Sequence, residues 1–252
     1  MKIDFPTPKQ NKQLMKLWQE AFGDTEDFVE GFFYTGFSPS RCRCVLSGRK
    51  VVAAAYWLDV RYAGCRYAYI YAVAVAEARR NKGICSQLMA DLHAHLTLRG
   101  YDGALLVPQN DDLRAMYEHM GYTSCTTVSE FTCEAAAEPA DLHRIDRDTY
   151  AQLRRDLLPE GSVIQEEENI AFLETMAFFY QGEDVLVAAH AENGHLRCPE
   201  LLGNVSRAPG ILTALKCSEG FFRTPGGDKP FAMFLPLKKH AQAPKYLGLA
   251  FD

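Results

Sequence analysis

The segment 79–86, RRNKGICS, places three cations directly before a glycine and a regular apolar pattern directly after it. Apolar residues recur every four positions from Ile84 to Leu96, which predicts an amphipathic helix that begins at Gly83. The first N–H groups of a helix have no partner inside it, and the helix dipole adds partial positive charge there. Since Gly83 lacks a Cβ, its backbone can approach a ligand closely. The segment therefore predicts an anion site, and a diphosphate is its natural ligand.

Two well-known phosphate-binding loops do not occur in the chain. The GxGxxG pattern of dinucleotide-binding folds is absent, and so is the GxxxxGK[ST] pattern of P-loop proteins. The segment instead reads RxxGx followed by a small residue, and the pattern before it is that of an antiparallel strand pair. That context does not fit the parallel sheet of a dinucleotide-binding fold.

The elements that must position this segment can be read along the first half of the chain. Thr7-Pro8-Lys9-Gln10 is typical of a capping box, and it predicts a helix to about Gly23 with a second helix over about 24–34. Runs rich in β-branched and aromatic residues predict an antiparallel meander over 42–48, 50–64 and 66–75. Beyond the helix that ends at Gly100, we expect a buried strand over 103–108, a helix over 110–121 and a strand over 122–134.

The second half follows a linker at 135–141 and echoes the first. We expect helices over about 141–157 and 163–179, a strand pair around 184–191 and beyond, a helix near 208–217, and strands over 231–236 and 245–251. The segment 207–211, RAPGI, repeats 80–84, RNKGI, at an offset of 127 residues, and AMFLP repeats ALLVP at an offset of 128. Two matches at nearly one offset indicate a duplicated domain. Because Pro209 stands where Lys82 would be, the second copy is predicted to have no anion site.

Composition limits the function and the location. The 252 residues include 27 basic and 32 acidic side chains, so the net charge of −5 argues against broad nucleic-acid binding. Without an apolar run of 18 residues or a secretory signal, we expect no membrane partner and a cytoplasmic location. Eight scattered cysteines without CxxC, and histidines without HxxxH or HExxH, predict reduced thiols and no metal site. The expected assembly is a monomer or a homodimer.

Four elements in residues 70–122 together resemble the coenzyme A site of the GCN5-related N-acetyltransferase (GNAT) superfamily. YAVAV (71–75) is similar to its V-x-V strand, and RNKGIC (80–85) resembles its [RQ]-x-x-G-x-[GA] loop. LLVPQND (105–111) resembles the fifth strand with its following asparagine. LRAMYEHMGY (113–122) resembles the A-x-x-x-Y-x-x-x-G-[FY] helix, although the tyrosine here is two residues after the alanine rather than four. The likeness extends over about 1–134.

The resemblance implies a mixed α/β fold, α+β-like, with a central twisted and mostly antiparallel sheet flanked by helices. The catalytic domain would span 1–135, and a smaller, degenerate GNAT-like domain would span 141–252. The implied reaction is direct transfer of acetyl from acetyl-CoA to an amine through a tetrahedral intermediate. The acceptor would be a small amine, an amino acid derivative or a peptide N-terminus. The alternative is a non-catalytic, regulatory module that binds acetyl-CoA.

The resemblance also implies a role for individual positions. The strand backbone at Val73, Ala74 and Val75 would bind the pantetheine arm, and the N–H of Val73 would stabilise the oxyanion. The pyrophosphate would be bound by the loop residues Arg80, Asn81, Lys82, Gly83, Ile84, Cys85 and Ser86. Asn110 would contact the cofactor further along its arm. Tyr117 would protonate the departing thiolate, since a phenol and an alkyl thiol have comparable pKa values.

Several points stay open at this stage. Strand 66–75 carries no carboxylate, so the general base could be Glu77, Glu26, Asp27, a water relay or the C-terminal carboxylate of Asp252. Cys85 stands where the family has glycine or alanine, and a thiol at a helix N-terminus can be reactive. The many aromatic residues of the meander would suit an apolar or cationic acceptor, but sheet packing explains them better. These aromatic residues are Tyr56, Trp57, Tyr62, Tyr67, Tyr69 and Tyr71.

Overall fold

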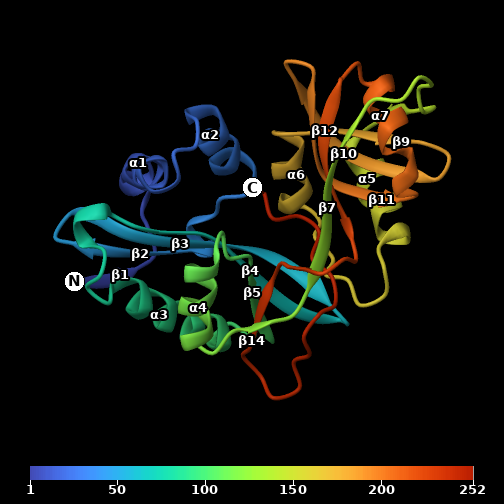
Figure 1. The fold of residues 1–252 in the computed structure, drawn as a ribbon. Coiled ribbons are helices and arrows are strands. Elements are labelled where there is room, and N and C mark those ends of the chain that lie inside the picture. Colours follow the sequence, from blue (N-terminus) through green and yellow to red (C-terminus); the bar gives the residue numbers. More distant parts are fainter. Residues whose placement is uncertain (252) are drawn as a thin grey trace. The chain divides into compact units, whose positions relative to one another are not determined.

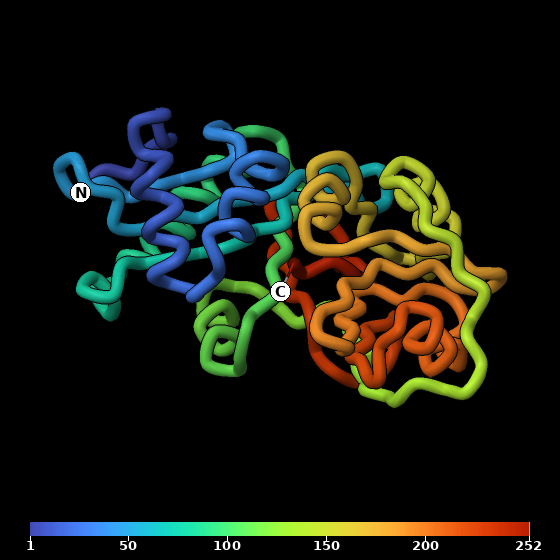
Figure 2. Tube along the Cα trace, turned by 90° about the horizontal axis from the view of Figure 1, so that it is seen from above, coloured from blue at the N-terminus to red at the C-terminus, as the bar shows by residue number. Residues whose placement is uncertain are grey.

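A computed structural model describes residues 1–251 and divides the chain into two compact units. Unit 1 consists of Met1–Thr123 together with Met233–Ala243. Unit 2 consists of residues 124–232 together with the C-terminal segment from Pro244. The chain therefore leaves unit 1, builds most of unit 2, returns to unit 1 for eleven residues and ends in unit 2, a path that the colours of Figure 2 follow from blue to red.

Unit 1 is built on a seven-stranded sheet with the order β1-β2-β3-β4-β5-β14-β6. Its strands are β1 (Lys2–Asp4), β2 (Cys42–Ser47), β3 (Lys50–Tyr62), β4 (Cys65–Val75), β5 (Gly103–Leu106), β14 (Met233–Pro236) and β6 (Thr123–Ser124). The long β2-β3-β4 meander is antiparallel, as the sequence predicts, whereas β4 and β5 run parallel. A parallel pair needs a crossover, and the helix that follows the glycine loop supplies it.

Four helices cover the two faces of this sheet, with α1 and α2 on one side and α3 and α4 on the other (Figure 1). They are α1 (Asn11–Phe22), α2 (Glu26–Thr35), α3 (Ile84–Leu98) and α4 (Asp111–His119). Their starts follow local rules. Gln10 Oε1 accepts the N–H of Thr7 (2.6 Å), Thr25 caps α2, and Asn110 Oδ1 accepts the N–H of Leu113 (2.9 Å) to cap α4.

The alternation of β-strands sorts the side chains of unit 1 between the two faces. Trp57 and Ile70 pack with Leu88 and Leu92 of α3 in one buried core. Each fully buried leucine contributes about 1.5–3 kcal/mol to the stability relative to exposure. On the α1 side, the ring of Trp18 contacts the rings of two tyrosines and two phenylalanines. These are Tyr56, Tyr71, Phe32 and Phe22.

Unit 2 has its own seven-stranded sheet, with the order β13-β7-β12-β11-β10-β9-β8. Its strands are β7 (Thr127–Glu134), β8 (His143–Ile145), β9 (Phe178–Gln181), β10 (Val185–Glu192), β11 (His195–Gly203), β12 (Glu219–Pro225) and β13 (Lys229–Pro230). Its helices are α5 (Arg147–Leu157), α6 (Glu168–Glu174) and α7 (Ala208–Ala214). β11 and β12 run parallel on either side of the α7 crossover, as β4 and β5 do around α3.

The two sheets share one strand order. β1 to β5 lie in sequence in unit 1, and β8 to β12 lie in sequence in unit 2. In each sheet the next strand comes from the other half of the chain: β14 pairs antiparallel with β5, and β7 pairs antiparallel with β12. This repeated order agrees with the sequence echo.

The strand expected at 231–236 is present, whereas the elements expected over 163–179 and 245–251 differ from the structure. The strand expected at 231–236 begins at Met233 and pairs with β5, so the repeated segments AMFLP and ALLVP lie side by side in one sheet. The helix expected over 163–179 is only Glu168–Glu174, and the aromatic run Phe178–Gln181 is a strand. The segment 245–251 forms a single bridge, Tyr246 to Ser162, rather than a strand. Most apolar residues of these segments are buried, although Phe178 is exposed, and the neighbouring strands and loops decide which secondary structure each segment adopts.

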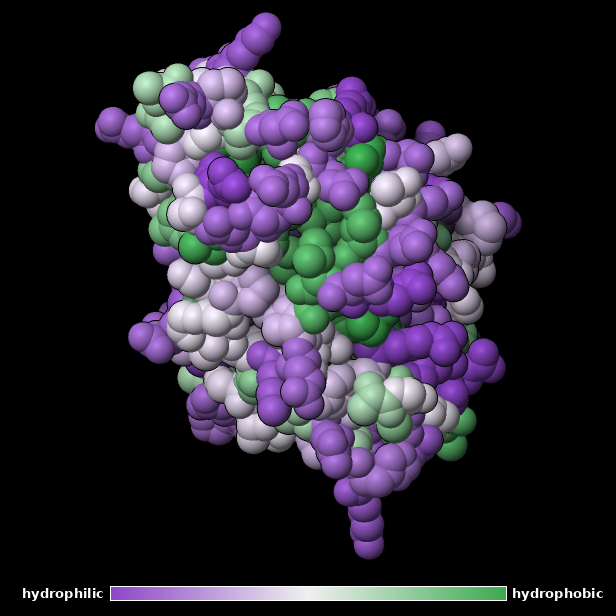
Figure 3. Space-filling view, turned by 90° about the vertical axis from the view of Figure 1, so that its right-hand side faces the viewer, coloured by the Kyte–Doolittle hydropathy of each residue, from purple (hydrophilic) through white to green (hydrophobic). Residues whose placement is uncertain are grey.

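The surface and the helices bear on whether the protein could enter a membrane. On the face drawn in Figure 3, hydrophilic side chains surround a hydrophobic area. Within residues 1–251, the structure contains no helix with both the length and the apolarity that crossing a membrane requires.

Candidate active site

A bulge interrupts β4 at the segment that the sequence singles out as the V-x-V strand. Ala54 faces Ala74 and Tyr56 faces Tyr71, so one residue of β3 opposes two residues of β4, Ala72 and Val73. Ala72 takes up this extra length with a φ of 49°, a left-handed value that is unusual for a residue other than glycine. The bulge takes the backbone of Val73 out of the regular pairing with β3.

The opposite edge of β4 is open at the same place. β4 pairs with β5 only over Tyr67–Tyr69, and β5 itself ends at Leu106. In the part of the chain that the structure describes, no strand pairs with the β5-facing edge of β4 beyond Tyr69. An unpaired strand edge is a template for an extended ligand, because its N–H and C=O groups accept another backbone-like chain. The amide-containing pantetheine arm is such a ligand.

The glycine loop joins this edge to α3. A short 3₁₀ turn at Glu77–Arg79 follows β4, and the chain then adopts left-handed conformations at Asn81 (φ 60°) and Gly83 (φ 71°) before α3 begins at Ile84. Gly83 is the N-cap of α3, and no side chain caps the helix there. The first-turn N–H groups of α3 are therefore available to an anion.

The loop cations form hydrogen bonds within the loop as well as supplying positive charge. Arg80 Nε donates to the carbonyl of Val75 (3.2 Å), and Lys82 Nζ donates to the carbonyl of Ala78 (2.9 Å). Arg79, Arg80 and Lys82 are all exposed. The sequence predicted only that these cations supply charge to an anion site. The hydrogen bonds also stabilise the conformation of the loop and keep the positive charge beside the N-terminus of α3.

The residues at this helix start fit a diphosphate. A Cβ built on Gly83 would meet only Gln87 Nε2, at 4.0 Å, so the space above the glycine is open. Ile84 is buried and anchors the first turn, while Asn81, Lys82 and Ser86 are exposed. A cradle of backbone amides with open space over its glycine suits a bulky, doubly charged group.

Cys85 is a packing residue with a protonated thiol. Its side chain is half-buried and packs against the core under α3. Burial raises the pKa of the Cys85 thiol above its ordinary value, so the thiolate form is disfavoured despite the helix N-terminus. The reactive role left open by the sequence therefore has no electrostatic support.

Tyr117 lies on α4 with its ring in the same core. It is 6% exposed, and its ring meets that of Tyr122 edge-on at 5.8 Å. Burial raises the pKa of Tyr117, and the nearby Cys85 adds to the rise, so the phenol stays protonated at neutral pH. Tyr117 lies in the same core cluster as Ile84 of the first turn of α3, and Cys85 packs against that cluster. The shifted spacing in the sequence motif therefore still directs this tyrosine toward the core under α3.

Asn110 begins α4, and its side chain has a structural task. Its Oδ1 atom caps the helix at Leu113, and the residue is exposed. The cap uses the carbonyl oxygen and leaves the amide nitrogen to donate elsewhere. A ligand contact from Asn110 would therefore come through Nδ2 or the backbone.

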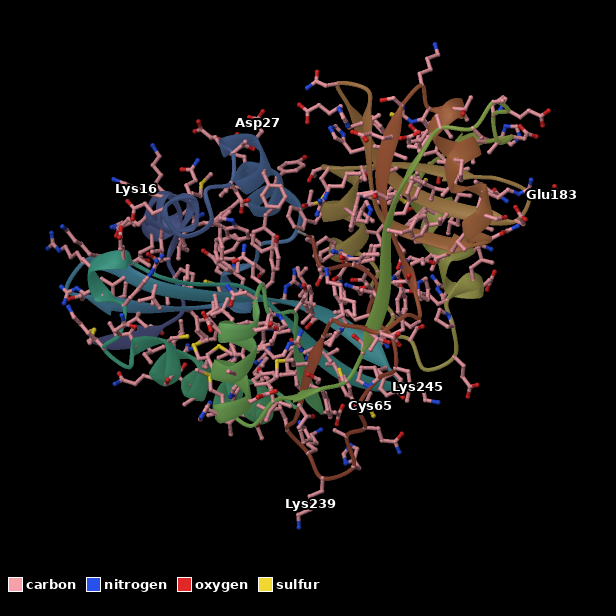
Figure 4. The ribbon with its side chains drawn as sticks, viewed as in Figure 1. Lys16, Asp27, Cys65, Glu183, Lys239 and Lys245 are labelled. Carbon is pink, nitrogen blue, oxygen red and sulfur yellow. The ribbon has the colours of Figure 1, made fainter. Side chains whose placement is uncertain are left out.

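The candidate general bases are surface carboxylates. Glu77 is exposed in the turn after β4, and Glu26 and Asp27 are exposed in the first turn of α2. Asp27 points outward from that helix in Figure 4. The carboxylate of Asp252 lies outside the described residues.

The sequence left open whether the aromatic residues of the meander form an acceptor face or only pack in the sheet. The ring of Tyr71, the residue directly before the bulge, packs against Trp18 (5.4 Å) and Phe32 (5.7 Å). The Tyr56 hydroxyl is buried beneath this cluster and has no hydrogen-bond partner within residues 1–251. The face of β4 next to the bulge is therefore aromatic. The alternation of aromatic residues along β3 and β4 is the only sequence signal for it.

An open strand edge beside a bulge in β4, followed by an uncapped helix start after a glycine loop, suits a ligand that combines an amide-containing arm with a diphosphate. The family model "Acetyltransferase (GNAT) domain" matches residues 2–125, and this part of the chain belongs to the GNAT acetyltransferase family. The family prediction from the four sequence elements is thereby confirmed. No curated protein is detectably similar to the chain in sequence.

Solved structures share the fold over nearly the whole chain. A GNAT from Kribbella flavida matches with a TM-score of 0.69 at 20% identity, covering 92% of this chain and 70% of its own. A GNAT from Anabaena variabilis matches with a TM-score of 0.72 at 14% identity, covering 94% and 73%. Eis1 from Mycobacterium abscessus matches with a TM-score of 0.66 at 12% identity, also covering 94% and 73%. These likenesses confirm the predicted mixed α/β fold.

Proposed function

We propose that the protein transfers acetyl from acetyl-CoA to an amine at the β4 bulge of unit 1. The observation that supports this most is the bulge at Ala72 and Val73, next to an open strand edge and leading to the uncapped start of α3. A regular strand would use its N–H groups in the ladder, whereas Val73 lies in the bulge, outside the regular pairing with β3, where its N–H could serve a reacting carbonyl.

Each part of acetyl-CoA has a place along this path. The open edge at Val73, Ala74 and Val75 binds the pantetheine arm through backbone hydrogen bonds. The amides from Asn81 to Ser86 bind the pyrophosphate, with Arg80 and Lys82 adding charge. Asn110 contacts the arm at the start of α4. Acetyl-CoA supplies the activated acyl group, and the chain supplies its orientation.

Two groups of the chain act on the reacting atoms. The Val73 N–H donates to the thioester oxygen as negative charge develops on it during amine attack. The Tyr117 hydroxyl donates its proton to the departing sulfur. Its raised pKa keeps the phenol protonated at neutral pH and also makes it a weaker acid than a free tyrosine. The acceptor amine reaches the thioester from the aromatic face formed by Tyr71 and its neighbours.

Unit 2 is proposed to be a degenerate copy that binds no coenzyme A. Its 3₁₀ turn, Val205–Arg207, runs directly into α7 at Ala208, so the four loop residues that precede α3 have no counterpart. Gly210 lies inside α7, where a Cβ would lie only 3.1 Å from the backbone nitrogen of Ala140, a tight contact. The Arg207 guanidinium is paired with Asp184 (3.0 Å). The repeated segment in unit 2 therefore has its glycine because of local packing and not to bind an anion.

Gly83→Ala is expected to weaken coenzyme A binding by at least about tenfold while leaving the protein folded. The new Cβ meets no protein backbone, but it projects into the space that the pyrophosphate needs, and the left-handed φ adds roughly 1–2 kcal/mol of strain. Isothermal titration with coenzyme A measures the change.

Gly100→Ala is the matched control for this measurement. Gly100 follows the other end of α3, has a φ of 85° and has nothing within 4 Å of a built Cβ. The strain is thus the same, without any ligand nearby. Equal affinities of the two variants for coenzyme A would contradict the assignment of the loop.

A further inference from the structure

Three side chains that could ligate a metal meet in unit 1, away from the β4 bulge. They are Cys65, Asp102 and His240, and one ligand atom from each lies within 4.8 Å of the other two. Cys65 opens β4 after the β3–β4 turn, Asp102 immediately precedes β5, and His240 lies in the segment that follows β14. Sequence spacing cannot reveal this group, because its members are separated by tens of residues and match no short motif.

The shape of the group distinguishes ligation from a proton relay. In a relay the histidine lies between the other two groups, which are then far apart, whereas here all three pairs are close. A triangle with sides of at most 4.8 Å always contains a point within about 2.8 Å of every corner (4.8 Å divided by √3). Zinc bonds to sulfur, nitrogen and oxygen are about 2.0–2.3 Å. Small side-chain adjustments would therefore bring all three atoms into bonding range.

Asp102 is the preorganised member of the group. It is 8% exposed, and its Oδ2 atom accepts the backbone N–H of Arg66 (2.9 Å). Its carbonyl accepts the N–H groups of Leu237 and Lys238 (2.9 and 3.0 Å), which fix the segment after β14 against it.

The other ligand oxygen, Oδ1, already attracts positive charge. It accepts from Lys238 Nζ (2.8 Å) and from His240 Nε2 (3.0 Å). Lys238 also donates to the carbonyl of Gly100 (2.9 Å), and its side chain is 37% exposed. The ammonium can therefore move outward onto Gly100 and solvent when a cation approaches Oδ1.

We propose that Cys65, Asp102 and His240 form a binding site for a zinc-like divalent metal ion, with water as the fourth ligand. A thiolate, an imidazole and a carboxylate are the ligands that zinc takes in proteins. The ion connects the segment 237–243 to the β3–β4 turn and to the start of β5. This connection stabilises β14, which immediately precedes that segment, in the unit 1 sheet. This role is independent of acetyl transfer, and it departs from the expectation of no metal.

Cobalt(II) titration of the reduced, chelator-free full chain tests the site, because cobalt replaces zinc in such sites and its thiolate complex absorbs in the near ultraviolet. One equivalent should bind with a thiolate charge-transfer band, and zinc should displace it. His240→Ala and Cys65→Ser should each weaken binding at least about tenfold, and Cys65→Ser should abolish the band. The His240 side chain is 63% exposed, so its loss should not disturb folding.

Matched controls separate this site from the other thiols and histidines. Cys133→Ser changes another half-buried thiol, and His195→Ala breaks an exposed pair with Glu219 (2.9 Å). Both variants should bind cobalt as the parent protein does.

Lys238 provides a test that distinguishes a metal site from a cluster held together by hydrogen bonds alone. If the ammonium competes with the ion for Oδ1, Lys238→Met should tighten metal binding at least about threefold, which isothermal titration with zinc measures. Lys239→Met is the control, because Lys239 extends from the loop into solvent while Cys65 lies at the base of that loop in Figure 4. Binding that is absent, that survives both ligand substitutions, or that weakens in Lys238→Met would overturn the proposal.

Discussion

Replacing Tyr117 by phenylalanine is expected to lower kcat by about a hundredfold with little change in the KM for acetyl-CoA. The substitution removes one oxygen from a ring that is 6% exposed and leaves its packing against Tyr122 in place. The departing thiolate then has to leave without a proton donor, so the loss falls on the chemical step. Steady-state kinetics with a good amine acceptor measures it.

Tyr122→Phe is the control for losing a buried phenol from the same core. Its hydroxyl is hydrogen-bonded to His93 Nε2 (2.8 Å), so its removal should lower the stability by about 1 kcal/mol. It should not remove a proton donor from the reaction. The pH profile adds a second check. Because burial raises the pKa of Tyr117, the acid stays protonated well above neutrality, and kcat should show no falling limb from this group below about pH 10. A Tyr117→Phe enzyme with parental kcat would remove the tyrosine from the mechanism.

Arg154→Met is expected to destabilise unit 2 by about 3–5 kcal/mol. Arg154 and Glu200 are 2% and 0% exposed, and two hydrogen bonds join them (2.6 and 3.0 Å). The hydroxyls of Tyr150 and Tyr246 also donate to Glu200 (2.9 and 3.2 Å). Without the guanidinium, the carboxylate is buried with no compensating charge. Urea unfolding followed by circular dichroism measures the loss, and hydrogen exchange should localise it to β10 and β11.

Two variants make this result specific. Arg155→Met removes the neighbouring arginine, whose pair with Glu166 (2.6 Å) is partly exposed, and should cost no more than about 1 kcal/mol. Arg154→Met combined with Glu200→Leu should recover much of the stability, because an apolar pair leaves no buried charge. A single Arg154→Met variant as stable as Arg155→Met would show that the buried pair is unimportant.

The sequence predicted features whose causes are local. The capping box at Thr7 begins the short 3₁₀ turn that leads into α1, and Asn110 caps α4. The start of α3 follows from a glycine that the left-handed N-cap requires. The meander follows from β-branched runs and from glycine turns. These signals act within a few residues, so one chain is enough to read them.

Features that depend on distant partners could not be predicted. The apolar segment at Met233–Pro236 would fill any buried sheet position, and only the tertiary fold assigns it to β5. The bulge depends on a left-handed alanine, Ala72, which has no sequence signature. The brace from Arg80 to Val75 likewise depends on how the loop folds back, whereas the charge of the loop was evident from its composition.

Amine-dependent release of coenzyme A thiol from acetyl-CoA tests the central claim most directly. The measurement uses the full chain and a panel of small amines, amino acid derivatives and peptides, with Tyr117→Phe and Gly83→Ala beside the parent protein. We predict thiol release that depends on both the amine and the parent sequence, and that falls in both variants. Tight coenzyme A binding with no thiol release above the rate of spontaneous hydrolysis for any amine would contradict an enzymatic role and favour a regulatory acetyl-CoA-binding module.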